Sequence, residues 1–213
     1  LLPRCSQRAC SGGEPDPAPP MARPNDTPPS PQHVVERTKQ WVEDVVIGLG
    51  LCPFAKPVFA RGLIAYVVSD ATSRGALLGD LERALLSLAA TDPAVTETTL
   101  LIHPRVLGDF LDYNDFLDDA DALLEALELE DDFQVASFHP RYQFADTEPD
   151  QIDNYTNRSP YPMLHLLRQA SITAARASYA DVEGVPARNI ATMQGLDAAT
   201  QQRLRDAVDD PSA

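Results

Sequence analysis

Three short apolar runs separated by helix-like stretches constrain the fold of this chain most. Residues 62–69, 98–103 and 133–139 are rich in β-branched or large apolar side chains, which is typical of buried strands. Between them, residues 73–90 and 107–129 carry leucines at three- and four-residue spacing, as amphipathic helices do. Strands that alternate with helices favour parallel neighbours joined by right-handed crossovers. We therefore expect an α/β fold in which helices pack on a mostly parallel sheet of three or more strands.

The N-terminal part of the chain changes character at Pro31. Residues 1–30 are rich in proline and poor in large apolar side chains, so we predict a disordered extension. From Pro31, apolar residues recur at helical spacing until Gly48 and Gly50, which predicts an N-terminal helix.

The C-terminal part is expected to close the domain. We predict an irregular segment over residues 185–195, then a last helix that Asp197 caps and that ends at Val208. Residues 209–213 are expected to fray. The sequence thus predicts one α/β domain over residues 31–208.

The charge and the cysteines narrow the class of protein. The chain has 17 Lys and Arg against 32 Asp and Glu, a formal net charge of -15, so nucleic acid and membrane surfaces are not expected partners. Cys5, Cys10 and Cys52 do not form a disulfide framework. No apolar run approaches the about 20 residues of a membrane-spanning helix. We therefore expect a cytoplasmic protein.

Polar side chains are densest in residues 154–168, Asn-Tyr-Thr-Asn-Arg-Ser-Pro-Tyr-Pro-Met-Leu-His-Leu-Leu-Arg. Ser159 is a suitable N-cap and Pro160 a suitable first helical residue, so we predict that a helix begins here. His165 and Arg168 would then share one face of that helix, because they are three residues apart.

Two strands end in the same dipeptide, His103-Pro104 and His139-Pro140. If the strands are parallel, both imidazoles emerge at the carboxyl edge of the sheet, where open α/β proteins bind ligands. The long loop after the third strand leaves from the same edge and leads to His165. We therefore expect His103, His139 and His165 to converge there.

Three kinds of site fit these residues. In the first, Arg158 with Arg141 or Arg168 binds a carboxylate or phosphate, and His139 or His165 transfers a proton. Loop residues that would complete this substrate-binding site are Asn154, Tyr155, Asn157 and Ser159.

In the second, His103, His139 and His165 or Asp146 bind a metal such as zinc, although no closely spaced ligand pair is present. In the third, Cys52 and a histidine form a nucleophilic pair, although a lone cysteine among apolar neighbours is more often a small buried hydrophobe.

The leading hypothesis is an enzyme that binds a small anionic metabolite through Arg158 and uses His139 and His165 for proton transfer. The alternative is a non-catalytic partner- or ligand-binding protein in which the same loop is a structural clasp. Concavity separates the two, because a closed, polar-lined cleft favours the enzyme and a flat aromatic patch favours the partner-binding protein.

Residues 51–55 (Leu-Cys-Pro-Phe-Ala), 136–147 (Ala-Ser-Phe-His-Pro-Arg-Tyr-Gln-Phe-Ala-Asp-Thr) and 154–168 resemble a bacterial family described as domain of unknown function 1415. The resemblance covers about residues 31–196. It implies no activity, cofactor or catalytic residue. In the family pattern the place of Asp146 often holds glycine, which weakens Asp146 as a ligand.

Overall fold

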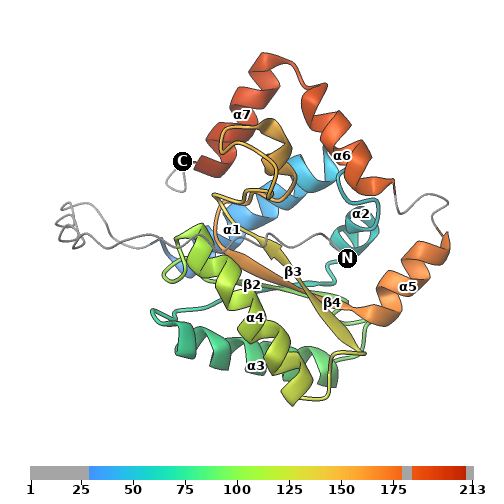
Figure 1. The fold of residues 1–213 in the computed structure, drawn as a ribbon. Helices are drawn as coiled ribbons and strands as arrows, with labels where there is room; N and C mark the ends of the chain where they lie inside the picture. Colours follow the sequence, from blue (N-terminus) through green and yellow to red (C-terminus); the bar gives the residue numbers. More distant parts are fainter. Residues whose placement is uncertain (1–28, 179–183, 210–213) are drawn as a thin grey trace, which may run out of the picture.

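Four strands form one sheet with helices on both faces (Figure 1). The computed structural model describes residues 29–178 and 184–209 of the 213-residue chain. The strands are β1 (Ile64–Val68), β2 (Thr98–Ile102), β3 (Phe133–Phe138) and β4 (Met163–Arg168), in the order β1-β2-β4-β3. The expected mixed α/β class is confirmed, and so are the three predicted strands.

The directions of the strands differ from the expectation. β1 and β2 are parallel, but β4 lies between β2 and β3 and is antiparallel to both. A mostly parallel sheet is therefore not confirmed. Since β4 opposes both neighbours, β1, β2 and β3 still run the same way, and their carboxyl ends meet at one edge of the sheet.

The helices α3 (Arg74–Ala90) and α4 (Phe110–Ala126) cover one face of the sheet (Figure 1). Ser73 caps α3 by accepting from the Ala76 amide at 3.3 Å. α4 is shorter than the predicted helix over residues 107–129, because Leu107 and Glu128 both have φ 56°, the left-handed region that interrupts a helix. Leucine and aromatic side chains of both helices form the first core with Leu101, Leu164 and Leu166.

The second core lies on the other face, under the N-terminal and C-terminal helices. The expected N-terminal helix is present as α1 (Pro31–Trp41), which continues as the π-helix η1 (Val42–Ile47). The short helices α2 (Ala55–Ala60) and η2 (Ile152–Thr156) follow later in the chain. The buried residues of this core include Val34, Trp41, Leu100, Tyr155, Met193 and Leu204.

Two predictions about secondary structure are wrong. Residues 163–168 form β4 and not a helix, because the segment pairs with strands on both sides and buries Met163, Leu164 and Leu166 completely. The expected irregular segment over residues 185–195 is the helix α6 (Val185–Gln194). It begins with Val185-Pro186, and proline is tolerated in a first helical turn.

The C-terminal helices are α5 (Gln169–Ser178), α6 and α7 (Ala198–Asp209). The predicted cap is confirmed, since the Asp197 carboxylate accepts from the Thr200 amide at 2.9 Å. Residues 1–28 of the predicted extension, with Cys5 and Cys10, and the tail from residue 210 lie outside the described residues. In the part of the chain that is described, every helix is too short or too polar to cross a membrane.

Candidate functional site

His103 and His139 lie together at the carboxyl edge, as predicted from the ends of their strands. Both are fully buried. Their rings contact the same aromatic side chain, Tyr113 of α4, with ring centroids 5.7 Å and 5.0 Å from it. The Tyr113 hydroxyl in turn donates to the Met163 carbonyl at 2.8 Å and accepts from the Phe138 amide at 3.1 Å. This phenol thus joins the two histidines to the ends of β3 and β4.

Burial keeps both rings neutral, and hydrogen bonds to the backbone hold them in place. His139 Nδ1 accepts from the Arg141 amide at 3.0 Å, so Nε2 carries the proton and donates to the Leu107 carbonyl at 3.1 Å. His103 Nδ1 donates to the Val106 carbonyl at 3.0 Å. Burial lowers the pKa of each ring to about 4. At neutral pH these two rings therefore hold loop backbone in place.

His165 does not join this pair. It lies on β4 opposite Leu100 and Ala136 and faces the second core, whereas Tyr113 packs in the first. Its Nε2 is 2.8 Å from the Thr98 hydroxyl, at the amino end of β2. Burial lowers its pKa to about 4 as well. The expected convergence of three histidines is therefore wrong for His165.

The predicted zinc ligands are not assembled. With His165 on the other face of the sheet, only His103 and His139 remain at the carboxyl edge, and Asp146 is exposed on the loop. Within residues 29–178 and 184–209, no group of three or more His, Cys, Asp or Glu side chains could hold a metal ion.

Arg158 is held inside the long loop. Its side chain is 8% exposed, its Nε donates to the Tyr142 carbonyl at 3.1 Å, and its Nη2 donates to the Pro149 carbonyl. The guanidinium carbon lies 4.4 Å from the centre of the Tyr155 ring. These contacts tie three parts of the loop together, as a clasp does.

The polar residues near Arg158 also hold the loop by hydrogen bonds to its backbone. Asn154 accepts from the Phe144 amide at 3.0 Å and donates to the Glu148 carbonyl at 2.8 Å. Asn157 covers the outer edge of β3, where its side chain donates to the Ser137 carbonyl and its carbonyl accepts from the His139 amide, both at 3.3 Å. Ser159 caps no helix, since its hydroxyl donates to the Tyr161 carbonyl at 2.7 Å. A role of these residues in substrate binding stays a prediction.

The two other predicted arginines have hydrogen-bond partners of their own. Arg141 is exposed, donates to the Gly108 carbonyl and lies 3.7 Å from the Asp109 carboxylate. Arg168, at the far end of β4, donates to carbonyl groups at the C-terminus of α3 and in the turn after it, those of Leu88, Thr91 and Thr96. An anion site that combines Arg158 with Arg168 is not preformed. One that combines Arg158 with Arg141 stays a prediction, since both positive charges act on His139 and lower its pKa.

Cys52 is a free thiol between η1 and α2. It is partly buried, and burial raises its pKa, which disfavours the reactive thiolate. Among the described residues no hydrogen bond joins its sulfur to a histidine. A Cys–His nucleophilic pair therefore stays a prediction.

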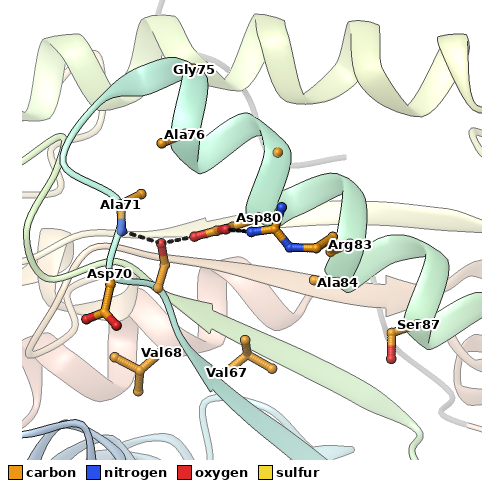
Figure 2. A pocket seen from close by; sticks show the side chains of 12 residues that line it. Val67, Val68, Asp70, Ala71, Gly75, Ala76, Asp80, Arg83, Ala84 and Ser87 are labelled. Atoms are coloured by element: carbon orange, nitrogen blue, oxygen red, sulfur yellow. Dashed lines mark hydrogen bonds and ion pairs between the residues drawn. The ribbon is translucent and has the colours of Figure 1, made fainter.

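A partly apolar groove of about 730 Å³ lies elsewhere, between β1 and α3 (Figure 2). One side is the end of β1 and the turn that follows it, and the other is one side of the helix. The lining residues are Val67, Val68, Ser69, Asp70, Ala71, Gly75, Ala76, Gly79, Asp80, Arg83, Ala84 and Ser87.

Three polar side chains form a chain of contacts within the groove. The Ser69 hydroxyl accepts from the Ala71 amide at 3.1 Å and donates to Asp80, and Asp80 also binds Arg83 (Figure 2). Ser69 is buried, while the Arg83 side chain is 74% exposed. The carboxylate of Asp80 is therefore fixed from both sides.

Gly75 and Gly79 are the feature that the sequence analysis missed. A Cβ atom built on Gly75 meets nothing within 4 Å, and one on Gly79 lies 3.6 Å from the flexible end of Arg83. Packing therefore does not require glycine at either position, although glycine within a helix costs about 0.5–1 kcal/mol relative to alanine. Two glycines four residues apart in an otherwise regular helical pattern were the available signal.

Comparisons with known proteins place the chain in a family but supply no activity. No curated protein matches it, and no solved structure does. The model of the family described as "Protein of unknown function (DUF1415)" matches residues 33–203, which confirms the resemblance seen in the sequence. By this match over most of its length, the chain belongs to that family.

Proposed function

We propose that this chain is a binding protein and that the groove between β1 and α3 is its binding surface. The observation that carries the proposal is the pair Gly75 and Gly79. Both open onto the groove and neither is required by packing, and Gly79, in the helix interior, also lowers helix stability relative to alanine. The missing side chains leave room beside β1, and a bound molecule is the physical reason for keeping that room.

Exposed apolar side chains beside the groove support the proposal. Val67 lines it and is 40% exposed. Leu86, which is 47% exposed, follows Gly79 by seven residues and therefore lies on the same side of α3. A partly apolar groove with a few fixed polar groups is the usual character of a ligand site.

An enzyme acting on a small anionic metabolite is the second candidate. Its best support is that His103 and His139 meet at the carboxyl edge. It requires Arg158 to leave the Tyr142 and Pro149 carbonyls, and it requires a neutral, fully bonded His139 to exchange its partners. We therefore rank the enzyme below the groove-binding function.

The experiment is a binding screen followed by ¹⁵N NMR, with fragments, peptides, phosphorylated metabolites and small carboxylates. We expect ligands that shift the amides of β1 and α3. Gly79→Leu should abolish these shifts, because the leucine side chain fills the groove. Ala89→Leu is the matched control, since Ala89 is exposed on α3 and does not line the groove.

Three outcomes would contradict the proposal that the groove is the binding surface. The first is binding that Gly79→Leu and Ala89→Leu weaken equally. The second is a library that leaves every groove amide unmoved. The third is an anion whose shifts centre on residues 139–162 and disappear in Arg158→Met, which would favour the enzyme.

A further inference from the structure

The outer edge of β1 offers unpaired backbone groups beside the groove. The Ser69 amide donates to the Ile102 carbonyl at 2.8 Å, and the Leu63 carbonyl accepts from the Glu97 amide at 2.9 Å, so these residues face β2. Backbone groups alternate in direction along a strand, and those of Ile64, Tyr66 and Val68 therefore point away from β2. Within the described residues they take part in no backbone hydrogen bond outside the sheet ladder.

The two edge strands of the sheet, β3 and β1, differ in how their outer backbone groups are covered. The carboxyl end of β3 is covered by Asn157. The sequence of β1, Ile-Ala-Tyr-Val-Val, contains no proline, no lysine and no other charge, so the strand itself lacks these protections of a sheet edge. Another strand can therefore pair with the unpaired backbone groups of this apolar edge.

We propose that the occupant of the groove is an extended peptide segment of another protein, which pairs with β1 as a fifth strand and places alternate side chains in the groove. This inference rests on the proposed function, since it takes the groove as the binding surface. Strand addition supplies affinity through the backbone, and the pockets beside the strand supply specificity.

The length of the groove fits one short strand. The helical lining runs from Gly75 to Ser87, which corresponds to about 18 Å of α-helix. The five residues of β1 span about 17 Å. A peptide of about five residues matches both lengths, and its part that pairs with Val67 and Val68, the β1 residues that line the groove, would lie beside α3.

Charge indicates the chemistry of the partner. The chain carries a net charge of -15, which draws basic segments towards it and repels a second copy. Of the charged groove residues, Asp80 and Arg83 are paired with each other, whereas Asp70 is 82% exposed and its ion pair with Arg105 is long, at 4.0 Å. Beside Gly75 and Gly79, aliphatic side chains have room to enter. We therefore expect a net basic segment with aliphatic residues at alternate positions.

The test begins with a displayed library of random heptapeptides, selected on the full chain and counter-selected on Gly79→Leu. Enriched peptides are synthesised and N-methylated at one amide at a time. Pairing with β1 predicts that methylation weakens binding by about tenfold at alternate amides and has little effect at the amides between them. A profile without alternation would overturn the proposal.

A pair of protein variants tests the same pairing by changing β1 instead of the peptide. Val68→Pro removes an outward-facing amide, which an edge strand tolerates, and Val68→Ala is the control that loses side-chain packing but keeps the amide. We expect about tenfold weaker peptide binding by Val68→Pro than by Val68→Ala. Equal binding by the two folded variants would overturn the proposal, and if Val68→Pro does not fold, the methylation profile decides.

Charge and self-association complete the test. Replacing the basic residues of an enriched peptide by glutamate should weaken binding, and more so at low salt.

If small molecules shift the groove amides but no peptide is enriched, this inference fails and the proposed function stands. If Val68→Pro converts a dimer into a monomer in sedimentation equilibrium, the occupant is a second copy and the inference fails. If no ligand of any kind reaches the groove, both fail.

Discussion

Acidification should destabilise this protein through the two histidines that contact Tyr113. His103 and His139 are fully buried, and burial lowers the pKa of each ring from 6.5 to about 4. The unfolded chain therefore binds more protons than the native protein between these two pKa values. The full stability is present above pH 6.5, and it decreases as the pH falls towards 4.

The size of the effect follows from the two pKa values. Linkage gives a loss of about 2 kcal/mol for each ring between about pH 7.5 and about pH 5. A positive charge on one ring lowers the pKa of the other, so the two losses do not simply add. Replacing one ring by a neutral side chain should remove its share of the pH dependence.

The assay is urea unfolding at the two pH values, followed by the fluorescence of Trp41, the single tryptophan, which is buried. His103→Asn keeps a donor for the Val106 carbonyl, and His139→Gln keeps one for the Leu107 carbonyl. We expect the difference between the two unfolding free energies to shrink by about 2 kcal/mol in each variant. Variants that keep the full pH dependence of the wild type would refute this reasoning.

Three further changes test other parts of the structure by the same unfolding assay. Gly79→Ala should raise the unfolding free energy by about 0.5–1 kcal/mol, and no gain would mean that packing does require glycine there. Tyr113→Phe should lower it by about 1–3 kcal/mol, because two strand groups lose their partner. Arg158→Met should lower it by about 2–3 kcal/mol and speed proteolysis of the loop over residues 140–158, whereas unchanged stability would argue against the clasp.

Most elements were predictable because their signals are local. The leucine spacing of residues 73–90 and the apolar runs at 98–103 and 133–139 depend on neighbours a few positions away. β4 was missed because Ser159-Pro160 is a good start for a helix in isolation. Its actual conformation is decided by β2, about 65 residues earlier, and by β3.

The candidate site was predictable only in part. The ends of two strands placed His103 and His139 together, since strand direction alone determines the edge at which they emerge. Nothing local shows that Arg158 bonds to the Tyr142 and Pro149 carbonyls, because these contacts depend on how the long loop folds back. The groove depends on where α3 sits beside β1, which is a property of the tertiary structure.

The position of β4 also has a consequence for how the chain is made. β3 pairs only with β4, so it has no strand neighbour until Arg168 has been synthesised. At about 5–20 residues per second, a ribosome needs about 2–6 seconds to travel from Phe138 to Arg168. During that interval the nascent chain carries β1 and β2 as a pair and β3 as a single apolar strand. Truncated chains that end before Met163 should therefore depend on chaperones, and the smallest fragment able to close the sheet extends from β1 through β4.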